Sequence, residues 1–349
     1  MANIGPEKGC SRQDSTRKWR PGSLLSAVGR KRQSATLVAT LMFASATAVA
    51  EPLVAPVVFA PGVISCGAND GAPTISPDGR ALYFERTNGR WSAILESHST
   101  AGQWSAPELA SFSGTSSDQQ PTLSPDGSYL IFVSSRPLPA PNGTDPNFAS
   151  HLYRVNREPQ GWSDPVELPT SVNISDRVFK PSIAGNGDLY FMSDVGGASF
   201  PQWRLFVARR TAGGYAPAEP LPFSGPEDHD VDPFIASDQS FLIFSSNTRG
   251  DIHDAHEHLF ITRRTASGWS AIAPIRYEGD TLGADDGEAQ VSPDGTTLYF
   301  TSSRVPPMAR VRTPETTQEG LQRMNTWDNG NSNVWMLPTT GFGELPAPK

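Results

Sequence analysis

The sequence has few cysteines, few charged residues and no excess of basic residues. Its 349 residues include only Cys10 and Cys66, and Cys10 falls in a segment that we expect to be removed, so no internal disulfide can form. Charged residues make up 18% of the chain, and 36 acidic against 28 basic residues give a formal net charge of −8. Because nucleic-acid binders usually carry a basic surface, we predict no nucleic-acid partner.

Motifs of several enzyme classes are also missing from the sequence. There is no glycine-rich phosphate-binding loop and no Gly-x-Ser-x-Gly nucleophile turn, and Cys66 has no evident base partner. Long helices are nearly excluded, because 31 Gly and 32 Pro interrupt the chain. Hydrophobic residues at 37%, with 17 Phe, 8 Trp and 7 Tyr, favour half-buried β-strands around a packed core.

Residues 1–50 differ from the rest of the chain. A basic cluster at Arg30–Arg32 is followed by an uncharged apolar run over 35–49, which ends in small residues just before Glu51. This order is typical of a secretory signal peptide cleaved after Ala50, and the run is short for a membrane span; an uncleaved anchor is the alternative. Residues 1–50 hold eight of the 28 basic and two of the 36 acidic residues, so the mature part has a net charge of −14. We expect a periplasmic or secreted protein with no stable membrane span after cleavage.

The rest of the chain repeats a short motif five times. A Ser-Pro-Asp-Gly turn followed by a Leu-x-Phe strand occurs three times, and two degenerate copies lie between the second and the third. The turns are Ser76–Gly79, Ser124–Gly127, Ala184–Gly187, Ala236–Gln239 and Ser292–Gly295. Successive turns are 48, 60, 52 and 56 residues apart, and such periods indicate a propeller, a solenoid or an array.

Each repeat has the pattern of four short antiparallel strands. Proline presets φ at the second position of the turn and glycine suits the last, so the turn joins two antiparallel strands. A third strand follows a variable loop, and a fourth opens with an aromatic residue. This pattern, without any helical period, predicts an all-β, five-bladed β-propeller of four-stranded antiparallel blades. The predicted blades cover residues 70–117, 118–175, 176–227, 228–285 and 286–349.

An extra strand precedes the first repeat, in a lead-in over residues 51–69. The apolar stretch Leu53–Ala60 is similar to a fourth strand, and a propeller whose last blade stays open would expose a strand edge. We therefore predict that this N-terminal strand closes the last blade. The tail Phe342–Lys349 is the alternative for that outer place.

The repeats resemble a known family. The Ser-Pro-Asp-Gly turn, the Leu-Tyr-Phe strand and the opening of the fourth strand, as in Gly102–Ser105, look like the TolB-like, WD-related propeller repeats of exported bacterial proteins. The resemblance covers roughly residues 70–349. It implies the fold and export, but little about function, because this scaffold hosts many functions.

Acidic residues recur where the chain reaches the first strand of each repeat, on the face that carries the long variable loops. Those that we take as catalytic candidates are Asp118, Asp176, Asp230, Asp286 and Glu288. Five blades would bring them to the mouth of the central channel. In one interpretation each Asp accepts backbone N–H bonds and fixes a turn; in the other, the acids bind a cation, a cationic ligand or a sugar.

Basic and aromatic residues near the same face are candidates for ligand binding. They are Arg136, Arg177, Lys180, Trp203, Arg304 and Trp327. The arginines that follow the second strands, Arg86, Arg136 and Arg304, can instead form ion pairs with the acids. Trp203 and Trp327 lie outside the register of the core tryptophans and close to long loops.

Histidines gather in the fourth repeat. His229, His253 and His256 lie in two loops of one predicted face, together with Asp230 and Asp232. Imidazole and carboxylate ligands suit a divalent transition metal, although the spacing matches no standard zinc motif. A solvated acidic loop is the alternative, and no other cofactor is predicted.

Two functions remain open at this point. The first is a monomeric binding module that takes an envelope protein or a glycan on the long-loop face. The alternative is a hydrolase or lyase that acts on a saccharide or small molecule with an acidic, metal-assisted site at the channel mouth. The sequence shows no complete catalytic constellation, and it leaves open whether the protein is an enzyme.

Overall fold

The computed structural model describes residues 53–136, 149–194, 202–250, 255–280, 283–305 and 313–342. The chain divides into two compact units, Met1–Ala50 and Glu51–Lys349, and all of the described residues belong to the second. The predicted signal peptide and the tail after Phe342 lie outside the described residues. Within the described ranges, no helix has the length and apolar character needed to cross a membrane.

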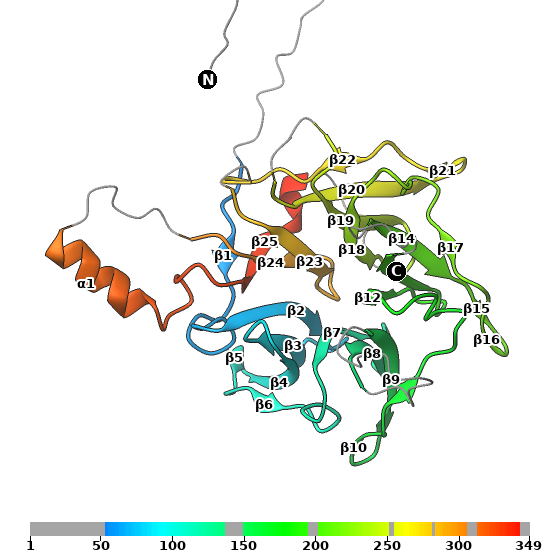
Figure 1. The fold of residues 1–349 in the computed structure, drawn as a ribbon, viewed down its shortest axis with the longest axis horizontal. Coiled ribbons are helices and arrows are strands. Elements are labelled where there is room, and N and C mark those ends of the chain that lie inside the picture. Colours follow the sequence, from blue (N-terminus) through cyan, green and yellow to red (C-terminus); the bar gives the residue numbers. More distant parts are fainter. Residues whose placement is uncertain are drawn as a thin grey trace, which may run out of the picture. The chain divides into compact units, whose positions relative to one another are not determined.

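The described residues form a five-bladed β-propeller, which confirms the predicted fold (Figure 1). The innermost strands of blades 1 to 5 are β2 (Asn69–Ile75), β7 (Asp118–Leu123), β12 (Val178–Ile183), β18 (Asp230–Ile235) and β23 (Asp286–Val291). The second strands are β3 (Ala81–Thr87), β8 (Tyr129–Ser134), β13 (Leu189–Asp194), β19 (Phe241–Ser246) and β24 (Thr297–Ser302). The third strands are β4 (Ser92–Thr100), β9 (His151–Glu158), β14 (Trp203–Ala208), β20 (His258–Thr265) and β25 (Asn333–Pro338). Every pairing is antiparallel, so each blade is a meander from the axis outward.

The outer strands are only two residues long. In blades 1 to 4 they are β6 (Glu108–Leu109), β11 (Val166–Glu167), β17 (Glu219–Pro220) and β22 (Ala273–Pro274). Short hairpins extend the third strands of these blades through β5 (Gln103–Trp104), β10 (Gly161–Trp162), β15 (Arg210–Thr211) with β16 (Gly214–Tyr215), and β21 (Gly268–Trp269). Short outer strands leave little free strand edge, which limits edge-to-edge pairing between molecules.

The N-terminal strand closes the ring, as predicted. Strand β1 (Val57–Val58) pairs antiparallel with β25, in the register Val57 to Met336 and Val58 to Trp335. The next residue, Phe59, donates its N–H to the Val334 carbonyl at 2.8 Å. Blade 5 therefore takes its outer strand from the beginning of the fold.

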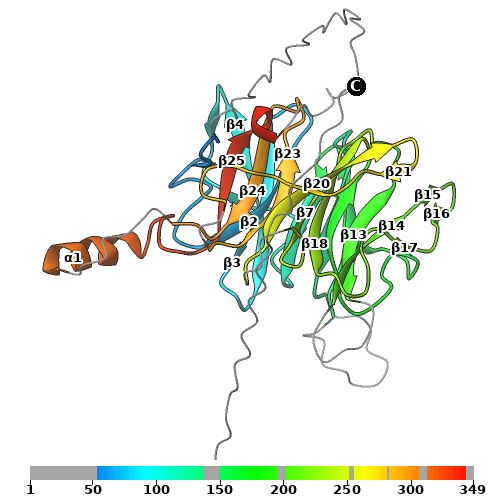
Figure 2. The ribbon, with the colours of Figure 1, turned by 90° about the horizontal axis from the view of Figure 1, so that it is seen from above.

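One helix interrupts blade 5. Helix α1 (Pro314–Arg323) lies between β24 and β25, in a stretch where the sequence indicated a loop, and a short 3₁₀ turn, η1 (Thr339–Phe342), follows β25. Thr313 caps α1 because its hydroxyl accepts the N–H of Thr316, and Pro314 occupies a first-turn position that needs no N–H partner. None of its residues is buried, and α1 projects away from the blades (Figures 1 and 2).

The Ser-Pro-Asp-Gly turns are held by their own side chains. In the first turn the Ser76 hydroxyl donates to Asp78 Oδ1 at 2.5 Å and accepts the N–H of Ala81 at 2.8 Å, while Gly79 adopts a positive φ of 71°. The hydroxyl bond lowers the pKa of the Asp78 carboxyl. The same serine-to-aspartate bond forms in the turns of the second and fifth blades, where Ser124 and Ser292 are the donors.

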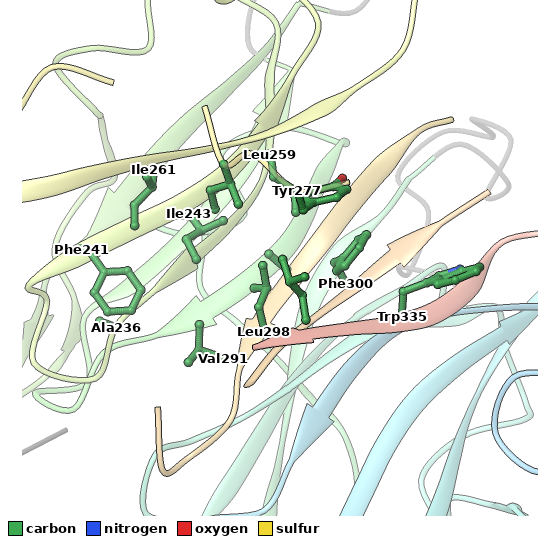
Figure 3. Close-up of a cluster of buried hydrophobic side chains, with 13 residues drawn as sticks. Ala236, Phe241, Ile243, Leu259, Ile261, Tyr277, Val291, Leu298, Phe300 and Trp335 are labelled. Carbon is green, nitrogen blue, oxygen red and sulfur yellow. The ribbon is translucent and has the colours of Figure 1, made fainter. Parts of the chain in front are cut away.

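The hydrophobic core lies between neighbouring blades. Five clusters of buried side chains correspond to the five interfaces between blades, including the interface between blades 5 and 1. Figure 3 shows the cluster between blades 4 and 5, where Phe241 and Ile243 face Val291, Leu298 and Phe300. Burial of one such side chain stabilises the fold by about 1.5–3 kcal/mol, so each interface depends on correct placement of both blades.

Phe59 tests the closure of the ring. Its ring is 7% exposed and packs edge-on against Trp104 of blade 1 at 5.7 Å and Tyr299 of blade 5 at 5.1 Å. We expect Phe59→Ala to lower the free energy of unfolding by about 3–5 kcal/mol, because it leaves a cavity between the first and last blades. Urea denaturation would measure the change. Leu53→Ala is the control, since Leu53 is 52% exposed, and an equal loss in both variants would contradict closure by Phe59.

Candidate functional site

Four of the recurrent acids are buried and paired with arginine. The side chains of Asp70, Asp118, Asp230 and Asp286 are at most 1% exposed. Their ion pairs are Arg86 with Asp70 at 2.6 Å, Arg136 with Asp118 at 2.5 Å, Arg249 with Asp230 at 2.6 Å and Arg304 with Asp286 at 2.9 Å. The guanidinium groups also donate to the Ile64, Phe112 and Phe223 carbonyls and to the Tyr277 hydroxyl. These ion pairs thus fix the loops before the inner strands of blades 1, 2, 4 and 5. Most hydrogen bonds that these acids and arginines can form are made to other groups of the protein.

Blade 3 departs from this pattern. The inner-strand position that pairs with a second-strand serine is Asp118 in blade 2, but it is Val178 in blade 3. Asp176 lies two residues earlier, with a side chain that is 86% exposed, so it does not join the buried acids. Arg177 pairs with Asp194 at 3.2 Å near the surface. The sequence placed Asp176 wrongly because the Ser-Asp-Arg run before β12 imitates the other repeats.

Blade 4 has a longer loop after its second strand. Asp230 pairs with Arg249, which lies three residues after Ser246, whereas Arg136 and Arg304 lie two residues after the equivalent serines. Arg249 also contacts Asp228 at 2.9 Å. The extra residue cannot be recognised until the strand register is known.

The predicted metal ligands are not brought together. His229 Nε2 lies 3.3 Å from Glu257 Oε1, and His256 Nδ1 lies 3.2 Å from Asp285 Oδ1. Asp230 is engaged by Arg249, and Asp232 lies in the central channel. His253 falls outside the described residues. Within the described part of the chain, no group of three or more His, Cys, Asp or Glu side chains is placed to hold a metal ion.

The two tryptophan candidates pack against the blades. Trp203 lies edge-on to Phe179 with ring centroids 5.4 Å apart, and the Arg177 guanidinium lies 5.2 Å from its ring. Trp327 lies edge-on to Trp335 at 5.6 Å, at the border of the core cluster between blades 4 and 5. Both indoles are half-buried, so they contribute to packing whether or not they also contact a ligand.

The central channel holds a ring of polar side chains. Each inner strand has a β-bulge, and at each bulge one residue other than glycine takes a positive φ between 43° and 55°. These five residues are Ala72, Gln120, Lys180, Asp232 and Glu288. A left-handed conformation is costly for such residues, so the surroundings must enforce it.

Hydrogen bonds from one blade to the next enforce the bulges. The backbone N–H of every bulge residue donates to a side chain of the preceding blade. The acceptors, in blade order, are Glu288 Oε2 for Ala72 (2.8 Å), Glu85 Oε2 for Gln120 (2.9 Å), Gln120 Oε1 for Lys180 (2.9 Å), Met192 Sδ for Asp232 (3.4 Å) and Asp232 Oδ2 for Glu288 (3.1 Å). The chain of bonds passes through all five blades and returns to the first.

Glu288 is the most connected member of this ring. Besides the Ala72 N–H, its carboxylate accepts the Thr301 hydroxyl at 2.7 Å and the Gln120 side-chain amide at 3.0 Å. Gly71 allows this approach, because a Cβ at that position would lie only 2.7 Å from Glu288 Oε2. Gly287 leaves equivalent room for Asp232, whose carboxylate oxygen would lie 2.6 Å from a Cβ. The two glycines therefore admit carboxylates between blades.

Burial shifts the protonation of two channel carboxyls. Desolvation, and then the charge of Glu288, raise the pKa of Glu85 to about 8, while the Gln120 N–H and Lys180 oppose the shift. Desolvation, followed by the charges of Glu288 and Glu257, also raises the pKa of Asp232 well above its usual range. Glu85 remains partly exposed, and a carboxyl whose pKa is raised to about 8 can donate a proton near neutral pH.

Glu85 was missed from the sequence. It follows Leu82-Tyr83-Phe84 in β3, where other repeats continue with Val133, Met192, Ser245 or Thr301. A carboxylate at an inward position of a hydrophobic strand is unusual, and that contrast was the available signal. The sequence indicated Glu288 as a catalytic candidate, Asp232 as a metal-ligand candidate and Lys180 as a ligand-binding candidate. It did not predict that all three are bulge residues of one ring.

A separate cavity of about 370 Å³ lies at the Ser-Pro-Asp-Gly end of the channel. Its walls include Leu123, Ile183, Ile235 and Val291 from the ends of the inner strands. None of the candidate site residues lines it. The polar ring and this apolar cavity are therefore distinct features of the channel.

Comparisons with solved structures agree on the fold. No family model matches the sequence, and no curated protein matches it. An α-L-arabinofuranosidase from Lactobacillus brevis is 14% identical, with a TM-score of 0.50, over 83% of this chain and 98% of that one. A putative TolB from Agrobacterium tumefaciens is 15% identical over 81% of both chains, with a TM-score of 0.47. TolB from Acinetobacter baumannii is 13% identical, with a TM-score of 0.44, over 79% of this chain and 55% of that one.

The five-bladed propeller itself confirms the fold that the TolB-like resemblance implied. The likeness to the arabinofuranosidase, at 14% identity, likewise shows the fold alone. The fold alone therefore does not choose between a binding protein and a hydrolase.

The buried ion pairs provide a test of structural role. Arg136→Met would leave the buried Asp118 carboxylate without its partner, so we expect the free energy of unfolding to fall by about 3–5 kcal/mol. Arg177→Met is the control, because its pair with Asp194 is exposed on the arginine side, and the expected change is within about 1 kcal/mol. Urea denaturation of both variants measures the difference. An unchanged stability for Arg136→Met would return that residue to the ligand-binding candidates.

The raised pKa of Glu85 predicts how stability depends on pH. The folded-state pKa of about 8 exceeds the unfolded value of about 4.3, so between these values the folded protein binds a proton that the unfolded chain lacks. This group therefore makes stability fall as pH rises from about 5 to 8, by up to about 1.4 kcal/mol per pH unit. Asp232 acts in the same direction.

We expect Glu85→Gln to flatten this decline, because glutamine still offers an oxygen to the Gln120 N–H but does not titrate. Urea midpoints at pH 5.5 and pH 8 would measure the effect. The control, Glu108→Gln, removes an exposed carboxyl from β6 and should leave the slope unchanged. Identical slopes in the wild type and Glu85→Gln would contradict the shifted pKa.

Proposed function

We propose that this protein is an exported hydrolase that cleaves a glycosidic bond in its central channel. The observation that carries the proposal is the pair formed by Glu85, a partly exposed carboxyl with a pKa of about 8, and the charged Glu288 that helps to raise it. Glycosidic hydrolysis commonly needs two carboxyl groups in opposite protonation states, one as acid and one as base or nucleophile. Neither of these two carboxyls forms an ion pair with an arginine of the described residues, unlike Asp70, Asp118, Asp230 and Asp286.

Glu85 and Glu288 would have different roles in cleavage of the glycosidic bond. Glu85 holds a proton at neutral pH and would give it to the glycosidic oxygen as the bond between that oxygen and the anomeric carbon breaks. The Glu288 carboxylate would take a proton from the attacking water, or attack the anomeric carbon itself. Gln120 contacts Glu288 directly and donates its backbone N–H to Glu85, and so holds the two groups in place.

The structural likeness to the Lactobacillus brevis α-L-arabinofuranosidase adds only that such chemistry occurs on this scaffold. The identity of 14% carries no substrate or residue role to this chain. The predicted leader over residues 1–50 supports an exported location, in the periplasm or outside the cell.

A second candidate is the binding module for an envelope protein or a glycan. Helix α1 favours it, since it projects from the propeller and carries Leu321, and Met324 follows it directly; these two side chains are 54% and 63% exposed. Exposed apolar side chains on a projecting element are suited to contact with a partner protein. This role needs no turnover.

Turnover tests the first candidate. The purified protein would be screened at pH 5 to 8 for release of nitrophenol from 4-nitrophenyl glycosides and of reducing ends from soluble polysaccharides. Glu85→Gln and Glu288→Gln should each lower kcat/KM by about 100-fold or more, because each removes one proton-transfer or nucleophilic group. Glu108→Gln should have no effect. The wild-type rate should fall as pH rises through about 8, where Glu85 loses its proton.

Two results would contradict the hydrolase. One is the absence of turnover on every substrate, which would leave the binding module as the better account. The other is turnover that persists in Glu85→Gln with an unchanged pH profile, which would place the chemistry elsewhere.

A further inference from the structure

Lys180 stands out among the charged residues of the channel. It is the bulge residue of β12, with a φ of 43°, and it is only 2% exposed. Its backbone N–H is satisfied by Gln120 Oε1 at 2.9 Å. No hydrogen bond or ion pair joins its ammonium group to any of the described residues. The residue is thus buried almost throughout, while its ammonium nitrogen is not one of the fully buried polar atoms without a partner and so keeps a small contact with solvent.

The ammonium group faces the other polar members of the ring. Its positive charge is close enough to lower the pKa values of both Glu85 and Asp232, against the larger effect of desolvation. It therefore lies among the same side chains that would act on a glycosidic bond. At a ring position where Gln120, Asp232 and Glu288 each bond across to a neighbouring blade, Lys180 alone leaves its polar end uncommitted.

The charges around Lys180 favour an anionic oxygen as its partner. Glu85 accepts the Gln120 N–H and Asp232 accepts the Glu288 N–H, and among the described residues neither carboxyl forms an ion pair with Lys180. Glu288 accepts the Ala72 N–H, the Thr301 hydroxyl and the Gln120 amide, and it forms no ion pair with Lys180 among the described residues. Three N–H donors of Lys180 are thus left for a group that enters the channel.

We propose that Lys180 binds a carboxylate of the substrate, and that the substrate is therefore an acidic saccharide. The carboxylate follows from Lys180 itself, whereas the saccharide part rests on the proposed function. In this arrangement the carboxylate of the sugar contacts the Lys180 ammonium while Glu85 and Glu288 face the glycosidic bond. Lys180 acts as a binding and specificity residue and transfers no proton in the reaction.

Binding selectivity tests this inference without any need for turnover. D-Glucuronate and D-glucose differ by the carboxylate at C6, and calorimetric titration would measure the affinity of the wild type for each. We expect glucuronate to bind at least about tenfold more tightly. Lys180→Met should bring the two affinities within about twofold, and Lys180→Arg should keep part of the preference because it keeps the charge.

Two controls separate binding from folding. Replacement of a buried charge by an apolar side chain of similar volume is often neutral or stabilising, so Lys180→Met should fold, and circular dichroism would check it. Arg177→Met removes a half-exposed cation three residues away in the sequence and should leave the selectivity unchanged.

Equal affinity for the two sugars, binding of neither, or a preference that survives in Lys180→Met would each overturn the inference. Its failure can be distinguished from failure of the proposed function. Turnover of neutral glycosides without glucuronate selectivity would remove only the role of Lys180. Selective binding that depends on Lys180 without turnover of any glycoside would remove only the hydrolase.

Discussion

The propeller depends on a hydrogen bond that is repeated at its axis. Each inner strand must bulge to fit five blades around a narrow channel, and each bulge turns one backbone N–H away from its own sheet. Inside a protein an unpaired N–H is costly, so each needs an acceptor from outside the blade. The preceding blade supplies it in every case. A ring of bonds therefore fixes neighbouring blades at the axis, while β1 and Phe59 fix them at the rim.

The same constraint brings titratable groups into a place with little water. Asp232 and Glu288 satisfy bulge N–H groups, and glycines at 71 and 287 give their carboxylates room between blades. Burial then raises the pKa values of Asp232 and Glu85, because the charged form loses its hydration. Closure of the fold and acid–base character thus come from one set of contacts.

The sequence was informative where a feature repeats and uninformative where it depends on register. The Ser-Pro-Asp-Gly turns predict blades because each turn makes its own bonds, and the apolar stretch before the first repeat predicts closure because an open edge is unfavourable. The channel ring could not be read in the same way. Proline follows four of the five bulge residues, as in Ala72-Pro73 and Lys180-Pro181, but this recurrence alone does not show that a bulge places them on the channel. Asp176 was aligned with the buried acids because the Ser-Asp-Arg run before β12 resembles the other repeats, although Val178 takes that position.

Closure of the ring does not require the charges that occupy it. In blade 4 the bulge N–H of Asp232 donates to the thioether sulfur of Met192. In blade 1 the bulge N–H of Ala72 also donates to the Thr301 hydroxyl at 3.0 Å. Neutral side chains therefore suffice for the structural bond, without the desolvation cost that Glu85, Asp232 and Lys180 impose. The Lys180 ammonium takes no part in the ring of bulge hydrogen bonds. A set of charges beyond what closure needs, gathered at one level of the channel, is better explained by a ligand than by stability.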